Sequence, residues 1–263
     1  MSANQIKYLK KLKIKKIIIF ITQISIALLF FITWELLSKY NIINSFIFSS
    51  PSKILSCLKE LNSTGKLFNH ILITSNEVLI SFILGSVTSF LIAIILYMSN
   101  TLKKITDPYI TILNSLPKVA LGPIIIIWIG ANNNSIIFMA LLINFIVSLI
   151  GFYNGFTNTD PYKIKLMKTL KATKIQTLTK LVIPSSLENI FSTLKLNISM
   201  SLIGVIMGEF LVSKEGIGYL ILYGTQVFNL NLVMTGIFIL IIQSFIFYKT
   251  LTIIEKILIK NHV

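Results

Sequence analysis

Six long apolar stretches separated by shorter polar segments dominate the chain. They cover residues 17–37, 78–98, 108–130, 135–153, 187–212 and 232–254. Each is close to the ~20 residues that a helix needs to cross the hydrocarbon core of a bilayer. Because a spanning backbone must satisfy its own hydrogen bonds, the pattern predicts an all-α membrane protein with about six transmembrane helices.

The first apolar stretch follows six lysines and so resembles a secretory signal peptide. It is longer than the apolar core of such a peptide, and no cleavage site with small residues follows it. We therefore interpret it as an uncleaved first helix. The predicted organisation is a basic cytoplasmic tail at 1–16 and one transmembrane domain at 17–263.

The segment between the first two stretches has an amphipathic pattern of its own. After Pro51, apolar residues recur at helical spacing over residues 52–61, and the run Asn62-Ser63-Thr64-Gly65 ends the pattern. Two interpretations are open: a helix lying at the membrane interface, or a helix in an ordinary extramembrane loop.

A second amphipathic pattern lies in the long connection at 154–186. Asp160-Pro161 favours a helix start, because aspartate caps the helix and proline fits its first position. Apolar residues then recur at roughly helical spacing, with lysines mostly on the other face, and Pro184 marks the end. The segment is either a solvated loop that follows the charge bias or a docking element for a cytoplasmic partner.

The composition supports membrane insertion and gives its direction. The chain is 54% hydrophobic and 13% charged, with a formal net charge of +15 that comes entirely from lysine. The lysines lie in short runs between apolar segments, which favours membrane orientation over nucleic-acid binding. With a cytoplasmic N-terminus, seventeen lysines lie inside and five outside. An even number of spans then returns the C-terminus to the cytoplasm.

Several kinds of chemistry are excluded by the residues available. Cys57 is the only cysteine and His70 and His262 the only histidines, so a thiol cluster or a histidine-based centre is not expected. Gly65-Lys66 is followed by leucine and lacks the upstream glycine of a phosphate-binding loop. The chain is therefore not expected to be an enzyme or to bind a cofactor. An ion-coupled transporter would favour paired broken helices, and the interruption at 117–123 has no counterpart in the other half.

The connection at 154–186 resembles the cytoplasmic loop of binding-protein-dependent ABC importer permeases. That loop reads E-A-A, three residues, Gly, nine residues, Ile-x-Leu-Pro. Here Lys165-Leu166-Met167 takes the first triplet, Lys171 the glycine position, and Leu181-x-Ile183-Pro184 the end. A lysine in the glycine position must adopt a left-handed conformation, at a cost of about 1–2 kcal/mol, or let the helix continue.

Further motifs resemble the branch of this family that handles sulfonates, taurine, nitrate and bicarbonate. They occur in the family's order, from about residue 49 to the C-terminus. They are Ser49-Ser50-Pro51-Ser52, the run from Leu116 to Pro123 with Trp128-Ile129-Gly130, Gly208-Glu209-Phe210-Leu211, and Gly216-Ile217-Gly218-Tyr219.

The resemblance implies a type I ABC importer permease (MetI-like) fold in a bacterial cell membrane. It implies a second permease copy, cytoplasmic ABC ATPase subunits that bind ATP and Mg, and an extracytoplasmic binding protein. The expected solute is an organic anion such as a sulfonate, taurine or nitrate. The alternative is a pyrimidine precursor of thiamine. The expected ATPase-coupling residues are Lys163, Lys165, Met167, Lys168, Leu170, Lys171, Ala172, Thr173, Gln176, Leu181, Ile183 and Pro184.

Polar residues within the apolar stretches are candidates for the solute pathway, because such residues are costly in lipid and usually face the bundle interior. They are Lys118, Lys195, Asn197, Ser199, Ser201 and Glu209. For the two lysines, snorkelling to an interface or pairing with a nearby acid is equally open. Glu209 is near the outer end of its span and could lie at the surface. Gly204 and Gly208 have the spacing of a close helix contact.

Overall fold

The computed structural model describes residues 3–260 and is built from helices. Residues 1, 2 and 261–263, with His262 and the outermost parts of the predicted tail and domain, lie outside the described residues. The elements are α1 Ala3–Lys39, α2 Ser45–Phe48, α3 Pro51–Ser63, α4 Lys66–Met98, α5 Asn100–Ser115, η1 Lys118–Leu121, α6 Gly122–Ile129, α7 Asn133–Thr157, α8 Pro161–Thr169, α9 Lys174–Thr177, η2 Leu178–Val182, α10 Ile183–Ser185, α11 Leu187–Val212, α12 Ile217–Gln226 and α13 Leu230–Lys260.

Five of the six predicted spans are single helices. By length and composition, α1, α4, α7, α11 and α13 could each cross a membrane. α11 has the bounds of the apolar stretch that predicted it, whereas α1, α4, α7 and α13 are longer, because the residues at their ends continue the same hydrogen-bond ladder. The helix that contains the first span begins at Ala3, so most of the predicted tail is helical.

The stretch predicted to span at 108–130 is not one straight helix, and the interruption noted at 117–123 is a sharp break. This stretch begins inside α5, and the chain then bends by 83° between α5 and the pair η1–α6. Leu116 has a ψ of 137°, because the ring of Pro117 disfavours helical geometry in the residue before it. Pro117 also has no N–H with which to continue the ladder of α5. A second proline, Pro123, then occupies the first turn of α6, where proline is tolerated.

Three long helices, α4, α7 and α11, form the centre of the bundle, and α7 and α11 share its most extensive contact. Gly204 and Gly208 of α11 lie on this contact. A Cβ at Gly204 would lie 2.4 Å from the Cα of Ala140, and one at Gly208 would lie 2.9 Å from the Cα of Ile136. The two backbones therefore approach more closely than any side chain at these positions would allow.

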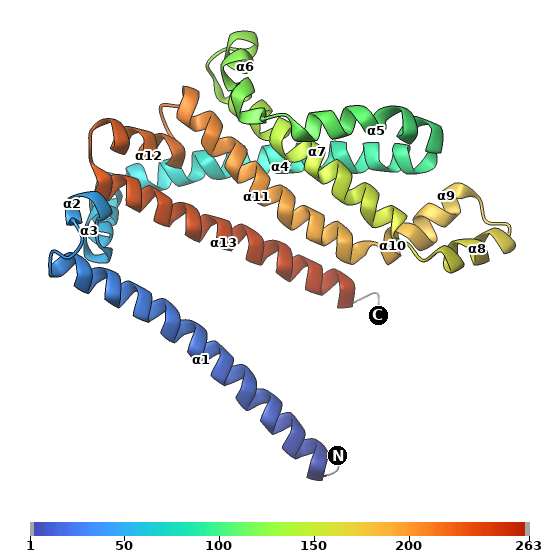
Figure 1. Cartoon of the computed structure of the whole chain (residues 1–263), viewed down its shortest axis with the longest axis horizontal. Helices are drawn as coiled ribbons and strands as arrows, with labels where there is room; N and C mark the ends of the chain where they lie inside the picture. Colours follow the sequence, from blue (N-terminus) through green and yellow to red (C-terminus); the bar gives the residue numbers. More distant parts are fainter. Residues whose placement is uncertain (1–2, 261–263) are drawn as a thin grey trace.

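The first helix diverges from this bundle. In Figure 1, α1 joins the rest of the molecule near α2 and α3, and its N-terminal end points away from α13. The Glu35 carboxylate ties the two parts, accepting hydrogen bonds from the backbone N–H and the hydroxyl of Ser52 at 3.0 and 2.8 Å. Most α1 side chains from Ile14 onward are exposed, as expected of a helix that faces lipid or another subunit.

The amphipathic pattern at 52–61 forms α3, which is slightly longer than predicted. Its N-terminus is capped by Ser50, whose hydroxyl accepts a hydrogen bond from the N–H of Lys53. Proline occupies the first turn, as the sequence indicated. The helix packs on α13 and α4 and leaves most of its surface exposed.

The short helix α12 was not predicted as a separate element. Its ten residues rise about 15 Å, half the thickness of the hydrocarbon core. It therefore cannot span, and it packs instead against α13, α11 and α4. Figure 1 shows it at the end of the molecule where α1 ends and α4 begins.

Candidate functional site

The lysine-rich connection folds as two short helices joined by a tight turn. The Asp160 carboxylate caps α8 by accepting a hydrogen bond from the N–H of Tyr162 at 2.8 Å. At the other end, the N–H of Lys171 donates to the carbonyl of Lys168 and the N–H of Ala172 donates to that of Met167. These two bonds form a Schellman motif with Lys171 in the left-handed position, at a φ of 56°.

The second helix of the connection has its own start signal. Thr173 and Gln176 form a capping box: the N–H of Gln176 donates to the Thr173 hydroxyl, and the N–H of Thr173 donates to the Gln176 side-chain oxygen. Because this cap begins a new helix, the turn at Lys171 is needed even though the residue there is not glycine. The two open possibilities for Lys171 are thus resolved in favour of the left-handed turn.

The return of the connection to the bundle is anchored in the core. Leu178 and Val182 of η2 are buried in an apolar cluster with Phe152 and Phe156 of α7. The Ser186 hydroxyl donates to the carbonyl of Gly155 at 2.8 Å. A force applied to α8 and α9 would therefore reach α7 and α11 through packed side chains.

The far side of the same connection is exposed and combines apolar and cationic groups. Leu166, Leu170 and Ile175 have exposed fractions of 60, 68 and 64%. The other predicted coupling residues are exposed or half-buried. The exposed ones are Lys163, Lys165, Lys168, Lys171, Thr173, Gln176 and Pro184, and the half-buried ones are Met167, Ala172, Leu181 and Ile183. Exposed leucines beside lysines are typical of a protein-docking surface.

Two of the predicted pathway residues belong to a polar network inside the bundle. The amide of Asn197 donates to the Ser86 hydroxyl at 2.7 Å, and the Ser201 hydroxyl donates to the Asn197 side-chain oxygen at 3.3 Å. Asn144, which the sequence did not single out, donates to Ser201 at 2.7 Å. All four side chains are buried between α4, α7 and α11 of one chain. Their hydrogen bonds tie three helices together.

The two intramembrane lysines have different environments. Lys195 pairs with Glu255 of α13 at 2.5 Å and lies over the ring of Tyr248, which is the pairing alternative raised from the sequence. Ser199 donates to the carbonyl of Lys195 within α11. Lys118 lies at the break between α5 and α6, and its ammonium donates to the carbonyl of Asn114 at 3.1 Å. Among the described residues it makes no ion pair.

Glu209 lies in the interior, not at the surface. Its exposed fraction is 0%. One carboxylate oxygen accepts a hydrogen bond from the hydroxyl of Thr74 at 2.6 Å, and the other accepts from the N–H of Gly218 at the start of α12. The hydroxyl of Thr74 in turn accepts from the N–H of Ile217 at 2.8 Å.

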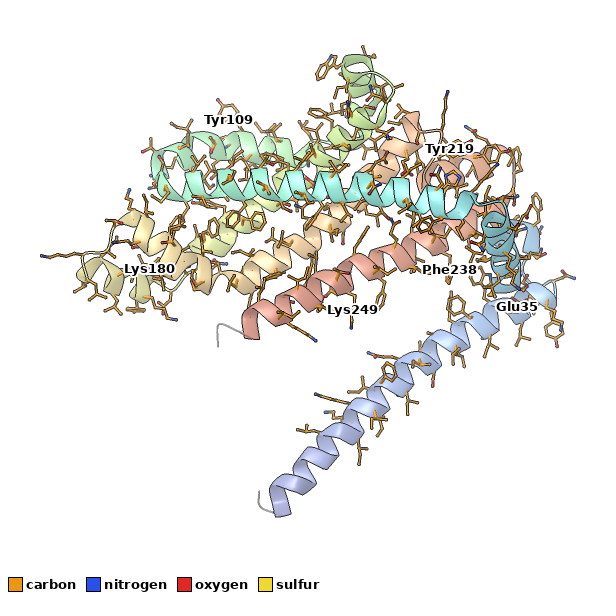
Figure 2. All side chains as sticks on the ribbon, turned by 180° about the vertical axis from the view of Figure 1, so that it is seen from behind. Glu35, Tyr109, Lys180, Tyr219, Phe238 and Lys249 are labelled. Carbon is orange, nitrogen blue, oxygen red and sulfur yellow. The ribbon has the colours of Figure 1, made fainter. Side chains whose placement is uncertain are left out.

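The N-terminus of α12 is thus capped by side chains from other helices. The N–H of Gly216 donates to Nδ1 of His70 at 2.9 Å, so three successive backbone amides find partners on α4 and α11. Sequence reasoning missed His70 and Thr74 in this role. Their partners lie more than 140 residues away, so no local pattern could identify them. Tyr219 lies close to His70, and Figure 2 shows it at the end of the molecule opposite Lys180.

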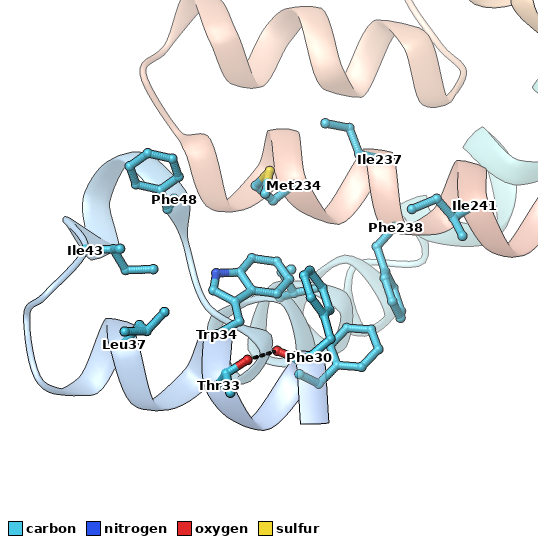
Figure 3. A pocket seen from close by; sticks show the side chains of 12 residues that line it. Phe30, Thr33, Trp34, Leu37, Ile43, Phe48, Met234, Ile237, Phe238 and Ile241 are labelled. Carbon is cyan, nitrogen blue, oxygen red and sulfur yellow. Dashed lines mark hydrogen bonds between the residues drawn. The ribbon is translucent and has the colours of Figure 1, made fainter. Parts of the chain in front are cut away.

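A separate apolar cleft of about 480 Å³ lies between α1 and α13 (Figure 3). Its lining includes Trp34, Met234 and Phe238, and the hydroxyl of Thr33 is used in a bond to the carbonyl of Phe30 in its own helix. None of the described residues that line the cleft carries a charge, and the indole N–H of Trp34 is its main polar group. The cleft is not a candidate for binding an organic anion.

Comparison with known proteins identifies relatives over most of the chain. A family model described as "Binding-protein-dependent transport system inner membrane component" matches residues 63–261. The putative aliphatic sulfonates transport permease protein SsuC of Bacillus subtilis is 26% identical over 86% of this chain and 82% of its own length. The formylaminopyrimidine transport permease protein ThiX of Halalkalibacterium halodurans is also 26% identical, over 88% and 92%.

A solved structure shares the fold. The methionine ABC transporter MetNI, in inward-facing conformations, superposes with a TM-score of 0.64 at 14% identity, covering 77% of this chain and 98% of the matched chain. The predicted fold class, an all-α permease fold of the MetI type, is therefore confirmed.

Proposed function

The chain belongs to the family of binding-protein-dependent transport system inner membrane components, and we propose that it forms the translocation pathway of an ATP-driven importer. ATP and Mg would be bound by separate cytoplasmic ATPase subunits, and solute would be delivered by an extracytoplasmic binding protein. The observation that carries this proposal is the α8–α9 connection, which is exposed on one side and anchored in the bundle on the other.

The distribution of lysines along the long axis supports a cytoplasmic N-terminus. In Figure 1 the two chain termini, the α4–α5 turn and the α8–α9 connection lie toward one end, whereas α2, α3 and α12 lie toward the other. The first group carries the seventeen lysines expected inside. Since lysine is enriched in cytoplasmic segments, we place the α8–α9 end in the cytoplasm and both termini with it.

Cysteine labelling tests this orientation. In a chain with Cys57→Ser, cysteine in place of the exposed Lys214 should react with a membrane-impermeant maleimide added to intact cells. Cysteine in place of Lys171 should react only after the membrane is permeabilised. The reverse pattern would invert the proposed topology. Gly216 is unsuitable for this test because its φ of 103° disfavours a side chain.

The α8–α9 connection would serve as the coupling element. When the ATPase subunits close on ATP, a short helical unit seated on them would move as one body. Leu178, Val182 and Ser186 would pass that displacement to α4 and α7. The exposed Leu166, Leu170 and Ile175 would supply apolar contact area, and the surrounding lysines would supply charge complementarity to an acidic rim.

Charge reversal on this surface tests the coupling role. In the variant Lys168→Glu/Lys171→Glu, we expect a roughly five- to thirtyfold weaker affinity for the ATPase subunit, seen as a loss of that subunit from the purified permease. Two like-charge contacts would replace two favourable ones, at about 1–2 kcal/mol in total. Lys104→Glu, an exposed lysine of the same end, is the matched control and should have no effect. Unchanged recovery with the double variant would remove the coupling assignment.

The pathway would lie between two copies of the chain, and Lys118 is the predicted pathway residue best placed to contact solute. The polar groups of the other candidates already have partners within one chain. Side chains of the same chain bond to Lys195, Asn197, Ser201 and Glu209, and the Ser199 hydroxyl bonds to the backbone of its own helix. Within residues 3–260, the ammonium of Lys118 has no carboxylate partner, and it lies at the break in the third span. A cation there would favour a small organic anion such as a sulfonate, taurine or nitrate.

A thiamine pyrimidine precursor is the second candidate solute, and the similarity to ThiX favours it. In importers of this kind, selectivity comes largely from the binding protein. Calorimetric titration of the associated binding protein with an alkyl sulfonate and with formylaminopyrimidine separates the two. The solute that binds tightly is the one that the importer carries.

A further inference from the structure

Two buried carboxyl groups lie where α4, α11 and α12 pack together. Glu209 has an exposed fraction of 0% and Glu77 one of 3%. His70, Thr74 and Glu77 follow one buried stripe of α4, and the Thr74 hydroxyl of that stripe donates to Glu209. Two carboxylates on such a face cannot hydrogen-bond to each other, because each is an acceptor and neither has a hydrogen to donate.

The two groups differ in what their surroundings provide. The Glu209 carboxylate accepts hydrogen bonds from the Thr74 hydroxyl, at 2.6 Å, and from the N–H of Gly218. It also lies at the N-terminus of the ten-residue helix α12. Donors and a helix N-terminus both stabilise a negative charge. Glu77 receives no such help: neither of its side-chain oxygens has a donor. The negative charge is therefore favoured on Glu209.

No cation in the vicinity neutralises the pair. Within residues 3–260, the ion pairs are Lys103–Asp107 and Lys195–Glu255, and neither involves Glu77 or Glu209. On α4, the Nδ1 of His70 accepts a hydrogen bond from the N–H of Gly216. Lys66, Lys214, Glu215 and Tyr219 line an open polar pocket at the mouth of this region together with His70. The ionisable residues of α7 and α13 lie in the halves of those helices nearer their C-termini.

We propose that Glu77 is a proton-binding site: its carboxyl group is protonated, and the O–H donates a hydrogen bond to the carboxylate of Glu209. The bond gives one buried oxygen of Glu77 a partner and leaves one negative charge on the pair. That charge then caps α12 through Gly218 and Thr74. A metal ion in place of the proton is disfavoured, because a hydroxyl and an amide hydrogen already point at Glu209.

Infrared spectroscopy of the purified full-length chain in lipid nanodiscs tests this assignment. We expect the C=O stretch of a protonated carboxylic acid near neutral pH, and its loss in Glu77→Gln, whose amide can still donate to Glu209. In Glu209→Gln the band should persist but shift, because its acceptor has changed. Absence of the band in the unmodified chain would overturn the proposal. A band that survives Glu77→Gln and vanishes in Glu209→Gln would place the proton on the wrong residue and would also overturn it.

The pH dependence of thermal stability provides a second readout. A group that holds its proton more tightly when folded stabilises the fold at low pH, and this contribution is lost as rising pH removes the proton. The melting temperature of the unmodified chain should therefore fall toward alkaline pH more steeply than that of Glu77→Gln. Glu215→Gln, which changes an exposed acid of the same end, should keep the slope of the unmodified chain. Equal slopes for all three proteins would contradict the proposal.

Discussion

Valine in place of Gly204 is expected to prevent the chain from folding into a stable bundle. A Cβ at this position would lie 2.4 Å from the Cα of Ala140 and 3.2 Å from its backbone nitrogen. These are backbone atoms of α7, so no side-chain rotation can relieve the overlap. Overpacking costs about 1–3 kcal/mol where neighbours can adjust, and we expect the upper end of this range or more here.

The measurement is thermal unfolding in detergent, combined with the fraction that elutes as a single species in gel filtration. Ile203→Val is the matched control, because Ile203 is adjacent in sequence but has a side chain that is 47% exposed. The control should unfold within a few degrees of the unmodified chain. A Gly204→Val protein that is monodisperse and equally stable would show that α7 and α11 do not need this close approach.

Leucine in place of Glu209 is expected to detach α12 from the bundle. The substitution removes the acceptors of the Thr74 hydroxyl and of the Gly218 N–H, and both donors are buried. Each of the two buried donors left without a partner costs about 1–3 kcal/mol, so we expect a loss of about 2–6 kcal/mol. The loss should be largely local, because α12 is short and is held at its N-terminus by this network.

Protease digestion and thermal unfolding together test this expectation. Cleavage within residues 213–229 should become fast in Glu209→Leu while the long helices remain protected. Glu215→Gln, six residues further along and exposed, should digest as the unmodified chain does. If the two variants behave alike, the capping of α12 by Glu209 does not hold this end of the chain.

The sequence identified helices more reliably than the contacts between them. Five spans were located correctly because hydropathy over ~20 residues is a property of a segment in lipid and does not depend on its neighbours. The start of α9 has an equally local cause that the sequence analysis did not use, since Thr173 and Gln176 form a capping box within four residues. Prolines at 117 and 123 were visible, but the 83° bend between α5 and α6 depends on how both helices pack.

The roles of buried polar residues were predicted least well. Asn197, Ser201 and Glu209 were selected because polar groups are costly in lipid, and that argument says only that each needs a partner. Glu77 was overlooked because it lies just before the predicted second span. The sequence does show an acid next to an apolar run. The role of that acid, however, depends on whether another acid, a base or water faces it in the folded protein.

The sequence by itself determined the class of molecule, the positions of most spans and the family. All of these depend on interactions within about twenty residues or on comparison with relatives. Only the structure decided that Lys171 adopts the left-handed conformation, that Asn144 and Ser201 bond each other, and that Lys195 pairs with Glu255. A hydrogen bond in a dry interior depends on which helix faces which, and that is settled by the packing of whole helices.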